Sequence, residues 1–461
     1  MKILMTGATG LIGKELGKKL IQKGHQIFVI SRNQEKAQRT LPFPCQVIEG
    51  DLSAGKIENA NLAQIEAVFH LAGENIGDGR WTSAKKTRIR NSRVQLTKNL
   101  IQSLEQSARL KLVVSASATG YYGDQANTEL TEQSDAGGDF LAKVCVDWEK
   151  AVLESPGLRS DVRRVVIRTG VVLAPFGGAL DKMKPIFQTG LGGALGSGEQ
   201  WMSWVHLEDL IQIYSLTLDH REMNGVYNAV APEVCTNREF SQKLAQSLGS
   251  RMGPAVPAWV LKIVLGEMAA VVLSSQRASC GKIQKLGFQF QFSGLEEALK
   301  NCCQHLTDGD QAFYAEQFVQ RPKSEVFPFF SEAKNLQKIT PEELHFNVIR
   351  SSTAAIEEGT LIDYRLKIHG VPVSWRTRIE TWNPPDHFVD TQLKGPYAKW
   401  HHTHSFVDMG GGTLMSDLVR YRMPLGCLGR LAAGPFVRKD ISKIFAYRQQ
   451  VVEKIFPSSR S

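Results

Sequence analysis

The chain has 461 residues, of which 42% are hydrophobic and 22% charged, and 55 Lys+Arg against 46 Asp+Glu give a formal net charge of +9. These proportions are typical of globular domains and exclude a disordered chain, a fibrous repeat and a small disulfide-stapled fold. At roughly 150 residues per domain, the length predicts two or three domains, each able to bury a core. The positive charge suits phosphate, nucleic acid or anionic lipid and does not choose among them.

The seven cysteines are scattered, and none follows another at C-x-x-C spacing. This pattern favours a reducing compartment over a disulfide framework or a zinc site. The longest apolar stretch, residues 259–273, contains Lys262 and Glu267 and is shorter than the roughly 20 residues that span a bilayer. No leader peptide is expected, because residues 2–5 already resemble a strand. We therefore expect a soluble protein of the cytoplasm.

Short apolar runs alternate with helical patterns through the first half of the chain. Helices are predicted at residues 11–23 and 93–106, and strands at 2–5, 26–30, 46–48, 67–71, 112–115, 164–168 and 226–229. Strands that alternate with helices of this length predict βαβ units and a parallel sheet. After about residue 240 the pattern becomes helical, with segments at 238–248, 258–273 and 295–303. These segments predict a small C-terminal substrate subdomain at about 240–303, which closes a first domain at 1–303.

The polar residues 304–312 predict a linker, and the character of the chain changes beyond them. A helix-rich piece at 323–338 lies among strand-like runs at 344–349, 361–369, 371–382, 388–394, 398–407 and 413–422. Turn residues separate these runs at His369-Gly370, Asn383-Pro384-Pro385 and Gly410-Gly411-Gly412. A final amphipathic helix is expected at about 435–456. This order predicts a separate α+β domain at 313–461.

The strongest motif is Thr6-Gly7-Ala8-Thr9-Gly10-Leu11-Ile12-Gly13, which follows the first strand and opens the first helix. Three glycines spaced G-x-x-G-x-x-G let the turn tighten and bring backbone N–H groups, with the positive end of the helix dipole, against a pyrophosphate. An ordinary strand-to-helix turn is the alternative interpretation, but the preceding strand, the following helix and the position near the start of the chain all agree with the motif. The motif therefore predicts dinucleotide binding in a Rossmann-type, doubly wound α/β fold, with the cofactor held by Gly7, Thr9, Gly10, Leu11, Ile12 and Gly13.

The second strand ends in Ser31-Arg32-Asn33, where an NAD site usually carries an acid for the ribose 2′-hydroxyl. Arg32 is a cation instead and suits a 2′-phosphate, although a solvated loop arginine is the alternative interpretation. Ser31 and Arg32 thus favour NADP(H) over NAD(H).

Together with the glycine turn, Gly50-Asp51-Leu52, His70-Leu71-Ala72-Gly73 and residues 115–123 resemble the extended short-chain dehydrogenase/reductase superfamily. The resemblance covers about residues 1–300. It implies that Asp51 and Leu52 flank the adenine and that Ala72 and Gly73, with Leu71 before them, line the adenosine ribose and phosphates. More narrowly, Gly79-Arg80-Trp81-Thr82 and Trp204-Val205-His206 resemble an atypical epimerase-like, cell-division-inhibitor-like branch whose substrate is poorly defined.

Reductases and epimerases of this superfamily use a Ser or Thr together with a Tyr-x-x-x-Lys pair, and the resemblance places Ser117 at the serine position. A residue merely tolerated near the cofactor is the alternative for Ser117. The helix that should carry the pair reads as residues 138–149 and contains no Tyr four residues before a Lys. Leu141 and Cys145 stand at those positions, so proton transfer needs a substitute.

Tyr121 and Tyr122 follow Ser117 in the same loop and are the nearest candidates for a proton donor. Lys143 would meet the nicotinamide ribose if the helix were rotated from the expected register. Packing aromatics and a surface charge are the respective alternatives. Cys145 is a conceivable nucleophile, although a small buried filler is its more ordinary role.

Residues 313–461 resemble the START-like helix-grip superfamily of polyketide cyclases and lipid-transfer proteins. The resemblance depends on element order, Gly395-Pro396-Tyr397 and Trp400-x-His402. It implies an antiparallel sheet wrapped around a long C-terminal helix, with an apolar cavity between them. The ligand expected there is a small, apolar molecule.

His401, His402 and His404 look at first like metal ligands. On a strand, His402 and His404 share a face with Trp400, and His401 points away. Because no Asp, Glu or Cys at ligand spacing joins them, we expect no metal.

The basic residues carry no recognised nucleic-acid motif, so no nucleic-acid partner is expected. A basic run at residues 80–93 could meet an acidic substrate, and a solvated helix face is an equal alternative. Basic residues between Arg420 and Arg448 could rest transiently on an anionic membrane. The sequence does not indicate an oligomeric state.

Two functions follow from these observations. The leading hypothesis is an NADP(H)-dependent oxidoreductase or epimerase-like enzyme whose hydrophobic substrate is held by the C-terminal domain. The alternative is a non-catalytic NADP(H)-binding sensor, or a carrier of a lipid or other hydrophobic ligand, that lacks the Tyr-Lys pair.

Overall fold

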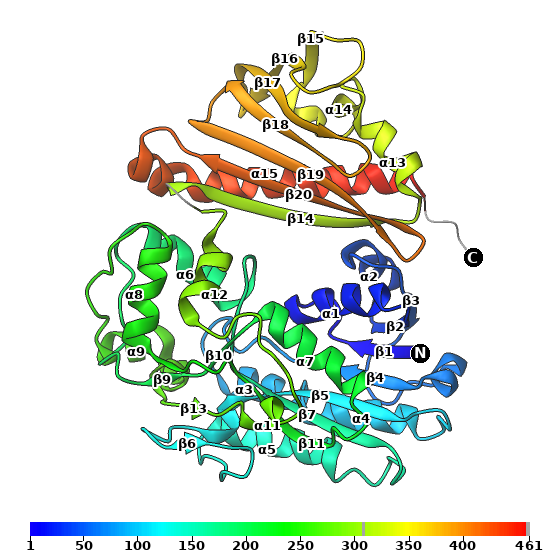
Figure 1. The fold of residues 1–461 in the computed structure, drawn as a ribbon, viewed down its shortest axis with the longest axis vertical. Coiled ribbons are helices and arrows are strands. Elements are labelled where there is room, and N and C mark those ends of the chain that lie inside the picture. The colour runs from blue at the N-terminus through cyan, green and yellow to red at the C-terminus, as the bar shows by residue number, and fades with distance from the viewer. Residues whose placement is uncertain (307–308, 458–461) are drawn as a thin grey trace. The chain divides into compact units, whose positions relative to one another are not determined.

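The computed structural model describes residues 1–306 and 309–457, so positions 307–308 of the predicted linker and 458–461 of the predicted second domain lie outside the described residues. The chain divides into two compact units (Figure 1). The first comprises Met1–Gln38 and Cys45–Gln304, and the second comprises Arg39–Pro44 and His305–Ser461. Among the described residues, no helix is long and apolar enough to cross a membrane.

A seven-stranded parallel sheet forms the centre of the first unit, in the order β11-β7-β5-β4-β1-β2-β3. Each strand predicted in the first half of the sequence belongs to it. The order reverses between β1 and β4, which is the point where open α/β sheets bind ligands. The strands are β1 (Lys2–Thr6), β2 (Gln26–Ser31), β3 (Gln46–Glu49), β4 (Ala67–His70), β5 (Leu112–Ala118), β7 (Arg163–Thr169) and β11 (Gly225–Ala229).

Helices cover both faces of this sheet (Figure 1). Leu4 of β1 and Val68 of β4 pack in one buried cluster with Leu100 of α4. Side chains alternate along a strand, so the equally buried Ile3 and Met5 of β1 serve the opposite face. This arrangement confirms the doubly wound α/β class. The helices are α1 (Leu11–Gln22), α2 (Gln34–Thr40), α3 (Ser83–Asn91), α4 (Val94–Leu104), α5 (Phe140–Leu153), α6 (Gly178–Gln188) and α7 (Leu207–Asp219).

The end of the first unit is helical, as the sequence indicates. The single helix expected at residues 258–273 is instead two helices, because Gly266 adopts a positive φ of 62° that interrupts the right-handed helix. Short strands β6 (Glu129–Leu130), β8 (Val171–Leu173), β9 (Trp201–Met202), β10 (Trp204–His206), β12 (Cys235–Thr236) and β13 (Arg277–Ala278) pair two by two. The helices are α8 (Asn237–Ser247), α9 (Ala258–Leu265), α10 (Ala269–Leu273), α11 (Gly281–Gln284) and α12 (Leu295–Cys303).

The second unit is an antiparallel sheet of seven strands in the order β14-β20-β19-β18-β17-β16-β15. The long helix α15 (Gly426–Ile455) lies along it (Figure 1). Ile441 of this helix is buried against Val419 and Tyr421 of β20. This confirms the predicted α+β class. The strands are β14 (Gln311–Val319), β15 (Asn347–Ser351), β16 (Leu361–Ile368), β17 (Val371–Asn383), β18 (His387–Lys394), β19 (Lys399–Met409) and β20 (Gly412–Arg422), and the short helices are α13 (Lys323–Phe330) and α14 (Asn335–Lys338).

Candidate functional site

The glycine turn between β1 and α1 leaves no room for side chains. Gly7 has a φ of 70°, and a Cβ there would lie 2.6 Å from the carbonyl carbon of Leu71. A Cβ on Gly13 would overlap the Gly7 carbonyl oxygen and lie 2.7 Å from Cα of Ala8. The turn therefore closes against the end of β4 and against the first turn of α1, which only glycine permits.

The first turn of α1 offers free backbone donors to an anion. Gly10 is the N-cap residue, no side chain caps the helix, and the first turn of α1, which is described throughout, carries no acid. Thr9 and Gly10 are exposed, and Leu11 and Ile12 are partly exposed. The uncapped N-terminus of α1 carries a partial positive charge and lies next to the glycine turn Gly7–Gly13, which we call the glycine cradle. This arrangement fits the pyrophosphate of a dinucleotide.

The ends of β2 and β3 lie beside this turn. Ser31 donates from Oγ to the carbonyl of Asn33 at 3.0 Å, which orders the turn that carries the exposed Arg32. Asp51 accepts hydrogen bonds from the hydroxyl and N–H of Ser53, and these bonds, with a smaller contribution from nearby Arg32, lower its pKa. The Leu52 side chain is buried in the core. The sheet thus brings Arg32 and Asp51 to neighbouring strand ends.

His70 holds the end of β4 in place. In the sequence it stands out only as part of the motif His70-Leu71-Ala72-Gly73. Its two ring nitrogens lie 2.7 Å from Oγ1 of Thr6 and 2.8 Å from Oγ1 of Thr97. Complete burial lowers the pKa of His70 to about 4, so the ring is neutral near pH 7. The contacts hold Leu71, Ala72 and Gly73 where β4 meets the glycine turn.

Ser117, at the end of β5, is one member of a buried hydrogen-bond chain. Its Oγ donates to Oε1 of Glu149 at 2.6 Å. Arg168 donates from Nε and Nη2 to both oxygens of Glu149, at 2.9 and 2.8 Å, and these two side chains are only 3% and 5% exposed. Arg168 also donates from Nη1 to the Tyr122 hydroxyl at 3.0 Å, and Tyr122 in turn donates to Asn228 at 2.7 Å.

The other proposed catalytic residues fall into two groups. The Tyr121 ring lies on the Arg168 guanidinium, 3.3 Å from ring centre to Cζ, so Tyr121, Tyr122 and Ser117 surround one arginine. Burial raises the pKa of Tyr122. Lys143, by contrast, is exposed on α5 and does not join this group. Cys145 is buried beneath it, and burial raises the pKa of its thiol to about 11.

Glu149, Arg168 and Asn228 are site residues that sequence reasoning did not find. One signal was available, because Arg168 interrupts an apolar strand and Glu149 lies on the buried side of α5. Ionisable side chains at core-facing positions need a partner. Nothing along the chain showed that these two partner each other.

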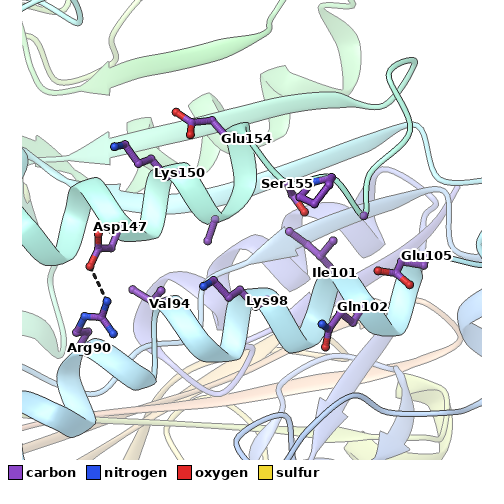
Figure 2. A pocket seen from close by; sticks show the side chains of 13 residues that line it. Arg90, Val94, Lys98, Ile101, Gln102, Glu105, Asp147, Lys150, Glu154 and Ser155 are labelled. Carbon is purple, nitrogen blue, oxygen red and sulfur yellow. Dashed lines mark hydrogen bonds and ion pairs between the residues drawn. The ribbon is translucent and has the colours of Figure 1, made fainter.

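A surface groove of about 480 Å³ lies between α4 and α5 (Figure 2). Figure 2 shows Arg90 pointing toward Asp147, and the two form an ion pair at 2.8 Å. Others of the basic run 80–93 are also paired, Lys85 and Arg88 with Glu74. These pairs engage the cations within the protein, which argues against an anion site for that run, although Lys85 is buried rather than solvated.

The second unit encloses a cavity of about 600 Å³ between the sheet and α15. Its walls are mostly apolar and include Phe330, Leu336, Trp375 and Phe388. The lining also contains ionisable side chains, and four of them form one buried cluster, Asp390, His402, His404 and Arg448. Such a shape fits an apolar molecule that carries one polar group.

The expectation that no acid joins the histidines is wrong. Asp390 of β18 stands opposite His402, and Asp417 of β20 stands opposite His404. Asp390 Oδ2 lies 3.4 Å from His402 Nδ1 and 3.1 Å from His404 Nε2, and Asp417 Oδ1 lies 3.0 Å from His402 Nε2 and 2.9 Å from His404 Nδ1. The carboxylates come from neighbouring strands, which spacing along β19 cannot reveal.

Arg448 of α15 completes the cluster, 3.1 Å from Asp417 Oδ1. Although burial opposes it, Arg448 and the two histidines hold the pKa of Asp417 well below its usual range. Burial, helped by neighbouring His404, lowers the pKa of His402. The pKa of His404 is raised, because hydrogen bonds with Asp390 and Asp417 outweigh its burial.

A parallel sheet with a glycine cradle at its switch point is the mark of a NAD(P)-binding Rossmann-type domain. Residues 3–229 match the NAD dependent epimerase/dehydratase family, and residues 256–302 match a domain of unknown function, DUF1731. The chain belongs to the epimerase family that includes SDR39U1 and its homologues.

Relatives and solved structures match about two thirds of the chain. The chloroplastic SDR39U1 homologue of Arabidopsis thaliana is 38% identical over 304 residues, which are 65% of this chain and 86% of the relative. Mycobacterium bovis Mb2239 is 34% identical over 298 residues, 64% of this chain and 96% of the relative. The crystal structure of human SDR39U1 (isoform 2) with NADPH has a TM-score of 0.59 and 31% identity, covering 66% of this chain and 99% of the human one. MoeE5 in complex with UDP-glucuronic acid and NAD, at 22% identity and a TM-score of 0.53, covers 65% of this chain and 96% of its own and shows the fold alone.

Proposed function

We propose that this protein binds NADP(H) in preference to NAD(H). We propose further that it uses the cofactor as an oxidoreductase or epimerase-like enzyme on a substrate with apolar character. The observation that carries the proposal is the glycine cradle at the switch point, with Arg32 rather than an acid at the end of β2. NADPH in the crystal structure of human SDR39U1 supports the same cofactor. Bound there, the nicotinamide would supply or accept a hydride.

Different residues of the site would contact different parts of the cofactor. Gly7, Gly10 and Gly13 would admit the pyrophosphate to the start of α1, and Arg32 would meet the 2′-phosphate as a charge-assisted donor. Asp51 and Leu52 would flank the adenine, while Leu71, Ala72 and Gly73 would line the ribose. The NAD-type alternative lacks its usual carboxylate at the end of β2, where the chain reads Ser31-Arg32-Asn33.

Fluorescence titration with NADPH and NADH tests the cofactor proposal. Arg32→Glu should weaken NADPH binding at least tenfold and leave NADH binding nearly unchanged, because only NADPH carries the 2′-phosphate. Arg109→Glu is the matched control, since Arg109 is also exposed and precedes β5, at the amino ends of the strands, whereas Arg32 follows β2 at their carboxyl ends. Equal affinities for the two cofactors, or an unchanged NADPH affinity in Arg32→Glu, would refute the preference.

In the enzyme, Ser117 would orient the substrate oxygen, and Tyr121 or Tyr122 would move the proton. Lys143 would contact the ribose only after a rearrangement, because its side chain is exposed. NADPH oxidation against a panel of apolar carbonyl compounds tests these roles. Activity that survives in both Ser117→Ala and Tyr122→Phe would remove the proposed site.

A non-catalytic NADP(H)-binding sensor or ligand carrier is the second candidate, and two contacts favour it. The Ser117 hydroxyl is committed to the buried Glu149, and Tyr122 is committed to Asn228. In this candidate the second unit is a START-like helix-grip domain whose cavity holds a lipid or similar molecule. Mass spectrometry of the molecule that co-purifies with the whole chain separates the two, since a reducible carbonyl compound supports the enzyme and a plain lipid supports the carrier.

A further inference from the structure

The Asp-His cluster in the cavity of the second unit brings the nitrogens of two rings against two carboxylates. Four nitrogen–oxygen distances of 2.9 to 3.4 Å join the rings to Asp390 and Asp417. Two of these contacts, His402 Nε2 with Asp417 and His404 Nε2 with Asp390, have hydrogen-bond geometry. A neutral imidazole carries one N–H, so two neutral rings satisfy both bonds and leave one nitrogen of each ring with a free lone pair.

Two imidazolium rings would supply four donors at a high electrostatic cost. The ring centres of His402 and His404 are 3.7 Å apart, and Arg448 already adds a positive charge at 3.1 Å from Asp417. Two charged rings at that spacing, in side chains less than a tenth exposed, would repel each other strongly. The two rings are therefore not both charged at once.

We propose that Asp390 Oδ2, His402 Nδ1 and His404 Nε2 bind a divalent transition-metal ion of the zinc type. The ligand atoms of these three residues lie within 4.8 Å of one another. Metal–ligand bonds of about 2.0–2.2 Å in a tetrahedral zinc site put neighbouring ligand atoms about 3.3 Å apart. Asp390 Oδ2 lies at 3.4 and 3.1 Å from the two nitrogens, so two of the three edges already match.

A bound metal would fix where the ring protons lie. With Nδ1 of His402 and Nε2 of His404 bound as lone pairs, the opposite nitrogens, Nε2 and Nδ1, would carry the two protons. Both of these nitrogens lie near Asp417 Oδ1, at 3.0 and 2.9 Å. A carboxylate that accepts from the far nitrogen of a metal-bound histidine fixes its tautomer and strengthens the ligand. Arg448 Nη2, 3.3 Å from His404 Nδ1, then serves Asp417 rather than the ring.

The surroundings orient both rings and leave one side open. The Phe388 ring stacks on His404 at 4.1 Å and 17°, and Phe445 meets His402 edge-on at 5.6 Å. The three ligands line the cavity, whereas Asp417 is not among the described residues that line it. The remaining coordination positions thus face the apolar space, which suits water or an oxygen donor of an apolar ligand.

Titration of the whole chain with metal ions tests the site. After treatment with a chelator, calorimetry with Zn²⁺ should give one site per chain, and Co²⁺ should give the intense visible bands of a low-coordinate nitrogen–oxygen site. His402→Asn and Asp390→Asn should abolish both signals. His401→Asn is the matched control, because His401 neighbours His402 on β19 and is not among the described residues that line the cavity. It should bind as the parent chain does.

The Asp417→Asn variant distinguishes a metal site from a cluster of ion pairs that binds no metal. It removes the group behind the rings but no ligand, so the Co²⁺ spectrum should persist while affinity falls roughly 10- to 100-fold. NADPH titration and the thermal unfolding of each variant show that the chain is folded. Binding below one tenth of an equivalent in the folded parent chain, or equal binding in the parent chain and His402→Asn, would overturn the proposal and leave the cluster as protonated ion pairs.

Discussion

Replacing Glu149 by glutamine should destabilise the first unit by about 3–5 kcal/mol, because it leaves a buried guanidinium without its counter-charge. Arg168 is 3% exposed and makes two hydrogen bonds to Glu149 of 2.9 and 2.8 Å. Glu149→Gln removes the charge and one acceptor, so Arg168 and Ser117 compete for a single amide oxygen. Arg168→Met leaves the carboxylate buried alone and should cost a similar amount. In the double variant both charges are gone, so the pair should show a coupling energy of about 2–3 kcal/mol.

Hydrogen exchange followed by mass spectrometry measures the free energy of local opening around this pair. Global denaturation of a chain with two units does not give a single free energy, whereas exchange in peptides from β5, β7 and α5 reports the opening of the elements that carry the network. Asp161→Asn is the control, since Asp161 pairs with Arg159 at an exposed surface and should show no measurable change. A shift below about 1 kcal/mol in Glu149→Gln would refute a tightly coupled buried pair.

Three further changes test the cradle, the fastened end of β4 and the cavity. Gly7→Ala should weaken NADPH binding at least tenfold, because a Cβ at φ 70° meets the Leu71 carbonyl carbon at 2.6 Å; an unchanged Kd in fluorescence titration contradicts this. His70 has a folded pKa of about 4, below the unfolded value of about 6.5, so the unfolded state binds more protons between them. Stability should therefore be full above pH 6.5 and fall by about 3 kcal/mol toward pH 4, and a His70 ring that titrates near pH 6.5 by NMR would show this to be wrong. Leu336→Trp should fill part of the cavity and reduce binding of an apolar fluorescent probe, with NADPH affinity unchanged.

The sequence could predict the first sheet because its strands are buried on both sides. Parallel strands covered by helices read as apolar runs, as Ile3, Leu4 and Met5 do in β1. Strand β14 was not assigned because its residues are mostly half-buried and mix polar with apolar, which gives no clear run. Its partner β20 lies about a hundred residues later, so only tertiary pairing defines it.

The candidate sites also differ in how far the sequence could predict them. The glycine cradle lies within one short segment of sequence, because Gly7, Gly10 and Gly13 follow one strand and start one helix. Its function could therefore be predicted from neighbouring residues. The pairing of Glu149 with Arg168 joins a helix to a strand, and that of Asp390 with His402 depends on the register between two strands. No spacing along one element could have predicted these partners.

The two buried polar clusters differ in what surrounds them, and this difference decides how each is interpreted. In the first unit each hydrogen bond has one donor and one acceptor, from the Ser117 hydroxyl through Arg168 to Tyr122 and Asn228. A chain of bonds that closes in this way rigidifies a core, so Ser117 and Tyr122 would have to exchange these partners to meet a substrate. In the second unit, Asp390 Oδ2 lies near one nitrogen of His402 and one of His404, and these side chains line a cavity. The second cluster therefore has room for a ligand beside it, whereas the first would bind one only by giving up bonds that it already makes.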